Sequence, residues 1–193
     1  MGKILDSLLV RDKHVCPWWC CFTFDNPVRK LLQDPVAILS PHVREGDLAV
    51  DIGAGMGYFS LPLCGLVGKT GRVIAVDLQE RMLGSLRKRA ARRGVGTNLE
   101  TRLCTQQGLG IVAKADFVLA FWMVHEVPDQ RAFLGEVHGI LNPGGRFLVA
   151  EPRIHVKETS FEETVRTAQD IGFIILARPV VSLSRSVLLT VSA

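Results

Sequence analysis

The segment Leu48–Phe59 constrains the fold of this chain most, because an apolar run passes directly into three glycines at alternate positions, Gly53, Gly55 and Gly57. An uninterrupted apolar run is typical of a parallel strand that is buried on both faces. Glycine lets the backbone turn sharply and approach a ligand that a Cβ atom would push away. Helical periodicity follows over residues 59–66. The glycines are therefore expected at a strand-to-helix turn, where free N–H groups bind a nucleotide-type cofactor.

The spacing of the glycines narrows the class of cofactor. A dinucleotide fingerprint, G-x-G-x-x-G counted from Gly53, requires its third glycine at position 58, which is Tyr58 here. The chain instead has G-x-G-x-G, preceded by Asp51 at the end of the strand. Asp77 closes the next apolar strand, where an acidic residue accepts hydrogen bonds from ribose hydroxyls. The pattern therefore favours a ribose-containing cofactor and weighs against a dinucleotide.

These residues resemble the class I S-adenosylmethionine-dependent methyltransferases. The first motif of that family is similar to residues 50–57, and its second strand ends in an acid like Asp77. Residues 115–121 resemble the fourth strand of the family, residues 122–127 the segment after it, and residues 141–149 the next turn and the fifth strand. These matches occur in the family's order along the chain, which makes them more specific than a glycine turn alone.

The resemblance, which runs from about Asp47 to the C-terminus, implies an α/β fold with a Rossmann-like, doubly wound, seven-stranded sheet. Alternating strand and helix patterns to about residue 172 also indicate a mostly parallel sheet with helices on both faces. A short turn joins the last two apolar runs, which predicts an antiparallel C-terminal hairpin. We expect residues 1–45 to form a helical, aromatic- and cysteine-rich cover segment and residues 46–193 the methyltransferase domain. Strands are expected at 47–52, 72–76, 98–103, 115–121, 145–150, 173–180 and 185–192.

The composition is typical of one globular enzyme domain. With 193 residues, of which 48% are hydrophobic and 22% charged, the chain can bury one sizeable core. The first residues lack the apolar segment of a secretory peptide, and no apolar run reaches the roughly 18 residues of a transmembrane helix. The five cysteines are an odd number, which favours reduced thiols over a disulfide framework. We therefore expect a cytoplasmic protein without a membrane partner.

The net charge of +4 has a local origin. Six basic residues lie between Arg81 and Arg93, in a segment whose apolar residues have helical spacing. The basic side chains are therefore expected on the solvated outer face of a helix. An RNA-binding surface would also need aromatic platforms or a second basic element nearby, and the sequence supplies neither. We expect no nucleic-acid partner.

The resemblance implies roles for residues around the glycine turn. Asp51 would hold the methionine portion of S-adenosylmethionine, Asp77 would bind the ribose, and Leu78 would pack on the adenine. The adenine contact after the third strand is the least defined, because residues 102–107 lack the acid or Asn that the family often has there. The alternative is that the glycines serve turn geometry alone. The expected cofactor-binding residues are Asp51, Gly53, Ala54, Gly55, Gly57, Tyr58, Phe59, Asp77, Leu78, Met82, Thr105 and Phe121.

Candidate catalytic residues follow the fourth and fifth strands. His125 and Glu126 come directly after the fourth strand, and the unperturbed pKa of an imidazole suits a general base near neutral pH. His125 would alternatively only cap or pack the helix that follows. Glu151 and His155, after the fifth strand, are further base candidates. Expected acceptor contacts on this side are Trp122, Glu151 and Arg153.

The N-terminal segment concentrates aromatic and thiol side chains, with three cysteines and four aromatic residues within residues 14–24. In methyltransferases that the chain resembles, such a segment often covers the active site. A soft-metal or metalloid site is an alternative, but its spacing differs from paired Cys-x-x-Cys ligands, so we expect no metal. A third interpretation is an aromatic cover whose cysteines act as small hydrophobes. The expected acceptor contacts here are Trp18, Trp19, Phe22 and Arg29, and the alternative metal ligands are His14, Cys16, Cys20 and Cys21.

Three functions remain open at this point. The leading hypothesis is an enzyme that transfers the methyl group of S-adenosylmethionine to a small molecule, such as a thiol, a metalloid or an aromatic compound. The second is a non-catalytic protein that binds S-adenosylmethionine or a metal. The third is a nicotinamide-dependent oxidoreductase, which conflicts with Tyr58 and with the expected terminal hairpin.

Overall fold

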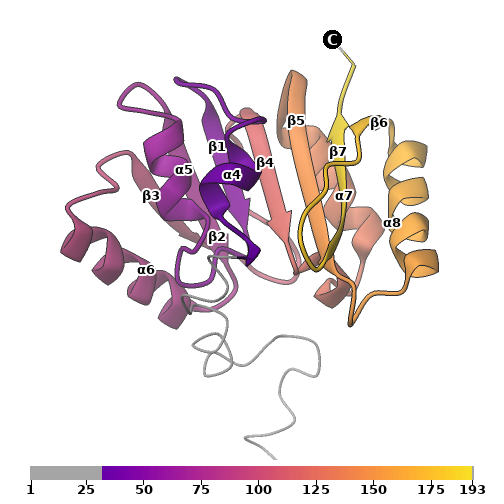
Figure 1. Cartoon of the computed structure of the whole chain (residues 1–193), viewed down its shortest axis with the longest axis horizontal. Helices are drawn as coiled ribbons and strands as arrows, with labels where there is room; N and C mark the ends of the chain where they lie inside the picture. The colour runs from indigo at the N-terminus through magenta and orange to yellow at the C-terminus, as the bar shows by residue number, and fades with distance from the viewer. Residues whose placement is uncertain (1–31, 193) are drawn as a thin grey trace, which may run out of the picture.

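The computed structural model describes residues 32–192, and their centre is one seven-stranded sheet (Figure 1). The strand order is β3-β2-β1-β4-β5-β7-β6. The first five strands pair in parallel, and β7 pairs antiparallel with both β5 and β6. This confirms the predicted doubly wound sheet and its antiparallel C-terminal hairpin. The strands are β1 (Leu48–Ile52), β2 (Arg72–Asp77), β3 (Leu99–Leu103), β4 (Ala115–Phe121), β5 (Leu141–Pro152), β6 (Ile174–Ala177) and β7 (Ser184–Thr190).

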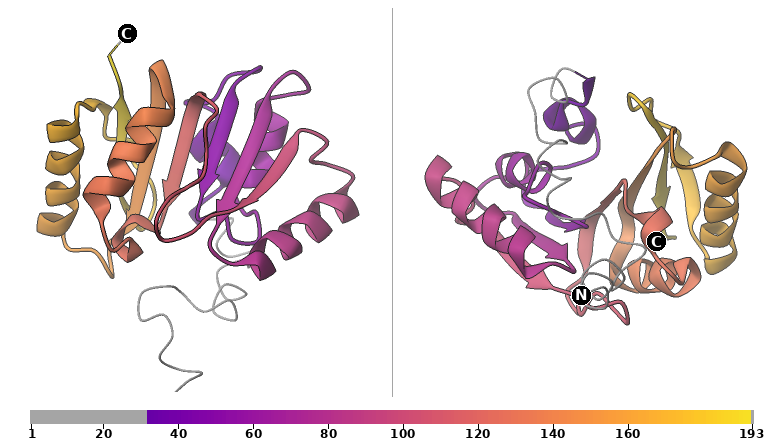
Figure 2. Two further views of the ribbon diagram at one scale, coloured as in Figure 1. Left: turned by 180° about the vertical axis from the view of Figure 1, so that it is seen from behind. Right: turned by 90° about the horizontal axis from the view of Figure 1, so that it is seen from below.

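Helices cover both faces of the sheet (Figure 2). Alternate side chains of a strand point to opposite faces, and on β1 this divides the core in two. Val50 and Ile52 belong to the core that α7 and α8 cover, whereas Ala49 belongs to the core that α4 and α5 cover. The helical elements are α4 (Pro35–Leu39), α5 (Ser60–Leu66), α6 (Glu80–Arg93), the 3-10 turn η1 (Val124–Glu126), α7 (Gln130–Ile140) and α8 (Glu158–Ile171). None of these described helices is long and apolar enough to cross a membrane.

Helix α6 follows the predicted amphipathic pattern. Its buried residues form one stripe that includes Leu86 and Ala90, and Gly94 ends the helix in the left-handed conformation that glycine adopts without strain. Arg92 and Arg93 lie in the last turn, where a positive charge interacts favourably with the helix dipole. The basic side chains are exposed as predicted, except that Arg89 is half-buried.

Strands β5 and β6 differ from their predicted limits. Strand β5 begins at Leu141 rather than at 145, because a bulge in the β4–β5 ladder admits the Pro-Gly-Gly turn. Asp116 holds this bulge: its carboxylate accepts from the Asn142 side-chain amide at 2.7 Å and from the Leu48 backbone N–H at 2.9 Å. Strand β6 ends at Ala177 rather than at 180, and Pro179, which cannot donate to a ladder, lies in the loop that follows.

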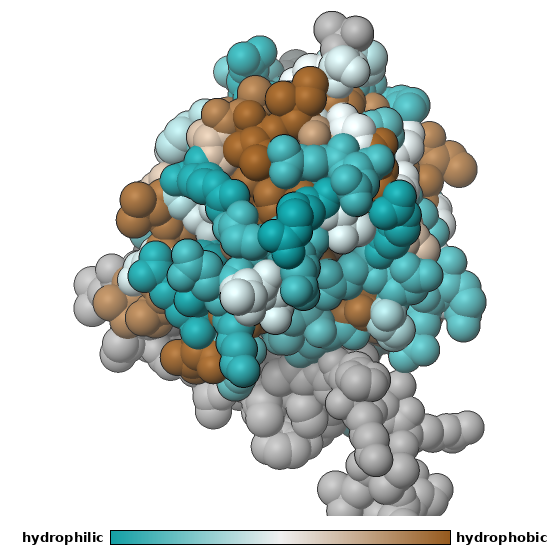
Figure 3. Space-filling view, turned by 90° about the vertical axis from the view of Figure 1, so that its right-hand side faces the viewer, coloured by the Kyte–Doolittle hydropathy of each residue, from teal (hydrophilic) through white to brown (hydrophobic). Residues whose placement is uncertain are grey.

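Strand β6 forms one edge of the sheet. Of its apolar side chains, Ile174 is 50% exposed and Leu176 is 52% exposed. The side of the molecule that carries α8 and β6 is largely hydrophilic, with apolar side chains gathered toward one end (Figure 3). The short length of β6, four residues, limits the unpaired edge that it offers to other chains.

The N-terminal segment was expected to be helical to about residue 45, and its described part contains little helix. Helix α4 has five residues, begins at Pro35 and is capped by Asp34, whose carboxylate accepts from the Val36 N–H at 3.0 Å. Residues 40–47 are turns and irregular chain. The expectations for residues 14–29, which include the aromatic acceptor contacts and the cysteines, lie outside the described residues.

Candidate functional site

A cavity of about 590 Å³ opens at the carboxyl ends of β1, β2 and β4, where doubly wound sheets bind their ligands. The glycine turn, the end of β2, the loop after β3 and the segment after β4 line it. The structure thus brings most of the predicted site together. Of the predicted residues that the structure describes, three do not line the cavity, namely Gly57, Glu151 and Arg153. The predicted residues that do are Asp51, Gly53, Ala54, Gly55, Tyr58, Phe59, Asp77, Leu78, Met82, Thr105, Phe121, Trp122, His125 and Glu126.

The glycine turn places open backbone against the cavity. The N–H groups of Gly53 and Ala54 donate to the Val76 carbonyl at 2.9 and 3.0 Å, which fixes the turn on β2. Gly55 has φ +54°, and a Cβ atom there would meet no protein atom within 4 Å. Gly55 is therefore a point where a ligand can approach the backbone closely.

Gly57 has a different position from the other two glycines. It is buried, has φ +83°, and a Cβ atom there would lie 2.1 Å from Cδ1 of Leu86 on α6. This glycine allows α6 to pack closely on the turn. Its placement matches the turn-geometry alternative considered for the glycines, whereas ligand contact at Gly55 stays a prediction for which the backbone leaves space.

Asp77 joins the end of β2 to the glycine turn. Its carboxylate accepts from the Gly55 N–H and from the Gln79 N–H, both at 2.8 Å. Burial raises the pKa of Asp77, and these two backbone donors oppose that rise. The side chain thus supplies a mostly buried, hydrogen-bonded carboxyl group beside the open backbone of Gly55.

Asp51 is the second acidic group at this end of the cavity. It is 2% exposed, and its carboxylate accepts from the Ser60 hydroxyl at 2.5 Å. The pKa of Asp51 is raised to about 7. Burial is the largest cause, the nearby Asp77 carboxylate also raises it, and the Ser60 hydrogen bond opposes the rise. A cationic ligand in the cavity would favour the ionised form of both acids.

The loop after β3 lines another side of the cavity. Thr105 and Gly108 pair across a tight turn, and the Leu109 N–H donates to the Glu136 carboxylate of α7 at 2.8 Å. Leu78, 39% exposed, and the buried Met82 add apolar surface nearby. Sequence reasoning missed Glu136, because nothing in its helical pattern distinguishes a carboxylate that holds a distant loop.

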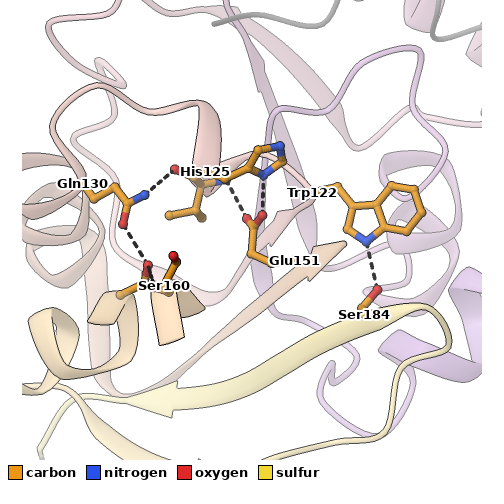
Figure 4. Close-up of polar contacts among 8 residues, drawn as sticks. Trp122, His125, Gln130, Glu151, Ser160 and Ser184 are labelled. Atoms are coloured by element: carbon orange, nitrogen blue, oxygen red, sulfur yellow. Dashed lines mark hydrogen bonds and ion pairs between the residues drawn. The ribbon is translucent and has the colours of Figure 1, made fainter. Parts of the chain in front are cut away.

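Four aromatic rings run from the glycine turn to the end of β4. The ring centroids of Tyr58 and Phe59 are 5.2 Å apart, those of Phe59 and Phe121 are 4.3 Å apart, and those of Phe121 and Trp122 are 5.6 Å apart. Trp122 has φ +60°, a strained conformation for a large side chain. Its indole N–H donates to the Ser184 hydroxyl at 2.9 Å (Figure 4). The cavity therefore has an aromatic lining that β7 helps to hold.

Gln33 connects the described start of the chain to this aromatic lining. It is 1% exposed, and its amide donates to the Ser182 carbonyl at 2.8 Å. The backbone carbonyl of Gln33 accepts from the Tyr58 hydroxyl at 2.9 Å. Gln33 thus ties the described start of the chain to Tyr58 of the cavity lining. No sequence signal marked Gln33, because its partners lie far away along the chain.

His125 lies in η1, and its side chain is 28% exposed. Its Nδ1 atom pairs with the carboxylate of Glu151 on β5, which is 2% exposed and lies behind the cavity lining (Figure 4). This hydrogen bond raises the pKa of His125, and burial opposes the rise. The structure therefore places Glu151, a predicted acceptor contact and base candidate, behind His125 and outside the cavity lining.

Two other predicted groups after β5 have separate positions. The Arg153 guanidinium donates through Nε to the Ser184 carbonyl at 2.9 Å, which ties the end of β5 to β7. His155 lines the cavity, with its ring nearly parallel to that of His125 at a centroid distance of 6.4 Å. Among residues 32–192, no group of three His, Cys, Asp or Glu side chains is arranged to hold a metal ion.

Comparison with known proteins places this cavity in context. A family profile described as a methyltransferase domain matches residues 44–175. The chain is similar to the ubiquinone/menaquinone biosynthesis C-methyltransferase UbiE of Cellvibrio japonicus, with 34% identity over 56% of this chain and 44% of that protein. UbiE of Escherichia coli O1:K1 is 31% identical over the same shares of the two chains. The matched part is thus less than half the length of these relatives.

Solved structures share the fold. A SAM-dependent methyltransferase from Aquifex aeolicus has a TM-score of 0.81 and 22% identity, covering 92% of this chain and all of that one. Fibrillarin of Aeropyrum pernix, solved with natively bound S-adenosyl-L-methionine, has a TM-score of 0.62 and 18% identity, covering 80% of this chain and 73% of that one. At these identities the likeness concerns the fold.

Proposed function

The chain belongs to the methyltransferase domain family, and from that premise we propose that it transfers the methyl group of S-adenosylmethionine to a small-molecule acceptor. One observation carries the proposal. The glycine turn and Asp77 lie at one end of a single cavity that Trp122 and His125 also line. Cofactor and acceptor would therefore meet within one enclosure.

The residues at the glycine end fit this cofactor. Gly55 gives the space for close approach, and the buried acids Asp51 and Asp77 suit a ligand that carries positive charge and ribose hydroxyls. When bound, the cofactor supplies an electrophilic methyl group on a sulfonium. The chain's own contribution is to bind and orient it, with Leu78 and Met82 as apolar contacts and Thr105 as the polar contact of the loop after β3.

The rest of the cavity lining suits a small apolar acceptor, for example an aromatic compound. Phe121 and Trp122 offer flat apolar surface, and His125 is the candidate base beside it. The similar UbiE proteins are named for methylation at carbon in ubiquinone and menaquinone biosynthesis. We propose that residues 1–45 cover the acceptor end, with Trp18, Trp19, Phe22 and Arg29 as contacts and residues 46–193 as the methyltransferase domain.

The compartment and the partner class are also proposals. We propose a cytoplasmic protein, on the odd number of cysteines and on the free thiols of Cys64 and Cys104. We propose an acceptor that is not a nucleic acid. Apart from the half-buried Arg89, the basic side chains of α6 form the exposed face of one helix, and the sequence supplies no second basic element beside them. RNA is nevertheless included as a test substrate, because TrmN of Thermus thermophilus and an rRNA methylase of Clostridium thermocellum share this fold.

Calorimetric titration tests the cofactor. We expect saturable binding of S-adenosylmethionine and none of NADH, with affinity about 100-fold weaker in Asp77→Ala because the ribose partner and the brace on Gly55 are both lost. The matched control is Asp116→Ala, which removes another carboxylate that holds backbone, outside the cavity lining. Unaltered affinity in Asp77→Ala, or binding of NADH alone, would overturn the assignment.

Transfer of a radiolabelled methyl group tests the acceptor class. We expect label to move from S-adenosylmethionine to 1,4-naphthalenediol, which is a small aromatic probe, and not to bulk tRNA or rRNA. Label in RNA alone would reject the small-molecule proposal. Binding of S-adenosylmethionine without transfer to any of these probes would favour the non-catalytic alternative.

A further inference from the structure

Glu151 makes two hydrogen bonds to one short turn. One carboxylate oxygen accepts from the Val124 backbone N–H at 2.8 Å, and the other pairs with Nδ1 of His125. Both partners belong to η1, which lies next to the cavity. Glu151 itself is 2% exposed and does not line the cavity. Its carboxylate is therefore directed at the turn from behind, away from any ligand.

We propose that Glu151 is a positioning residue that fixes the orientation and the tautomer of His125, so that Nε2 of His125 can take a proton from the acceptor. A carboxylate can only accept a hydrogen bond, so neutral His125 must carry its hydrogen on Nδ1. The lone pair then lies on Nε2, which points away from Glu151 (Figure 4). The same logic holds wherever a buried carboxylate orients a catalytic imidazole.

Glu151 is not the sole support of the η1 backbone among the described residues. On its other side, the Gln130 side-chain amide donates to the Val124 carbonyl at 3.2 Å. The Gln130 carbonyl oxygen in turn accepts from the Thr164 hydroxyl of α8 at 2.8 Å. A purely structural brace would require only the bond to the Val124 N–H. The second oxygen of Glu151 is instead used on the imidazole, and this is the observation that points to a role in proton transfer.

The inference rests on the proposed function and narrows its acceptor. The acceptor would lose a proton from an O–H or an acidic C–H bond to Nε2 of His125. The electron pair left on the acceptor forms the new bond to the methyl carbon, while the carbon–sulfur bond breaks and its electrons stay on sulfur, which becomes a neutral thioether. An acceptor that attacks with an existing lone pair, such as a thioether, would not need this arrangement.

Within residues 32–192, three titratable groups lie around His125. Glu151 lies behind it on β5, Glu126 follows it in η1, and His155 comes from the loop after β5. The two carboxylates raise the pKa of His125, with the Glu151 hydrogen bond as the largest cause. The neutral base form is thus reached at a higher pH than for a free histidine, and in that form the imidazole is a stronger base.

The test is nitrogen NMR of ¹⁵N-histidine-labelled full-length protein, with Glu151→Gln as the main variant and His125→Gln to identify the resonances. At pH 9 we expect wild-type His125 to carry its hydrogen on Nδ1. Glutamine has nearly the same shape, can still accept from the Val124 N–H, and would donate its amide to Nδ1. The hydrogen of His125 should therefore move to Nε2, and its pKa should fall.

Gln130→Ala is the matched control, because it loosens η1 from the opposite side and leaves the Glu151 carboxylate in place. We expect it to leave the tautomer unchanged. Identical His125 nitrogen shifts in wild type and Glu151→Gln, or the Nε2–H tautomer in wild type, would overturn the inference. If Glu151→Gln fails to fold, Glu151→Asp, which keeps the carboxylate, is measured for the same Nδ1–H tautomer.

A kinetic measurement extends the test to catalysis. With 1,4-naphthalenediol as acceptor, Glu151→Gln should lower kcat about 100-fold or more and shift the pH midpoint downward, with the cofactor Kd changed less than about twofold. An unchanged kcat and pH profile would contradict the inference. The NMR result needs no acceptor, so failure of the proposed function would show separately, as loss of cofactor binding or of methyl transfer by the wild type.

Discussion

The two ends of the cavity are built in different ways. At the end where we propose that the cofactor binds, called the cofactor end, which comprises the glycine turn, Asp51 and Asp77, the bond between Gly55 and Asp77 joins residues 22 positions apart. At the end where we propose that the acceptor binds, called the acceptor end, which comprises Trp122, His125 and their supports, Trp122 meets Ser184 at a separation of 62, and Gln33 meets Ser182 at 149. The cofactor end is thus one local strand–turn–helix–strand unit. The acceptor end depends on closing the whole sheet, so substitutions there can alter it without disturbing the cofactor end.

The two ends also treat buried acids differently. At the cofactor end, Asp51 is paired with the neutral Ser60 hydroxyl, and burial raises its pKa to about 7. At the acceptor end, Glu151 is paired with a histidine, and it is the pKa of His125 that rises. A cationic ligand would supply the positive charge that Asp51 lacks. Glu151 already has a group of this protein, His125, that can carry a positive charge beside it.

The largest expected effects separate two glycines within the cofactor end. Gly57→Ala should destabilise the fold by about 3 kcal/mol, because φ +83° strains an alanine and its Cβ would meet Leu86. Gly55→Ala should cost only about 1 kcal/mol in stability yet weaken S-adenosylmethionine binding about 100-fold. Chemical denaturation and calorimetry measure the two quantities. If Gly57→Ala instead loses affinity for S-adenosylmethionine while its stability is unchanged, the different roles assigned to the two glycines are wrong.

A smaller effect concerns pH. A cationic ligand favours the ionised form of Asp51, so the affinity for S-adenosylmethionine should rise about tenfold per pH unit up to about 7 and then level off. In the protein without ligand, the free energy of unfolding changes with pH in the opposite direction. The folded state binds a proton at Asp51 that the unfolded state has released, so stability should fall between about pH 4 and pH 7.

Asp51→Asn tests both halves of that statement. The variant should lose the pH dependence of binding and should be more stable than wild type at pH 8, by roughly 2 kcal/mol, because it buries no carboxylate. Calorimetry and thermal denaturation from pH 5 to pH 8 give the comparison. An Asp51→Asn protein whose affinity still follows pH with the same midpoint would assign the titration to another group.

The smallest expected effect tests the support of the acceptor end. Ser184→Ala leaves the Trp122 indole N–H without its acceptor on β7, which should cost about 1 kcal/mol and raise the acceptor KM about fivefold. The cofactor Kd should stay the same. Ser186→Ala is the control, since that hydroxyl lies on the same strand and bonds to the Pro179 carbonyl instead. If both serine variants changed the acceptor KM equally, the bond between Ser184 and Trp122 would not be what supports acceptor binding.

Much of the fold was predictable, because its signals are local. The apolar runs of β1 and β4 are buried on both faces, so they stand out without any partner strand. The limits of β5 and β6 were less predictable. A bulge stabilised by Asp116 lengthened β5, and the pairing partners of a strand are not contained in its own residues.

The sequence by itself located one end of the cavity, since Gly53, Gly55, Asp51 and Asp77 lie in one contiguous strand–turn–helix–strand unit. Only the tertiary structure decided that Gly57 packs against Leu86 rather than lining the cavity, and that Glu151 supports His125 from behind. Both outcomes depend on contacts between residues 26 or more positions apart, as His125 and Glu151 are. Such contacts form only when helices and strands pack together. Residue type alone does not specify whether a carboxylate will line the cavity or support another side chain from behind.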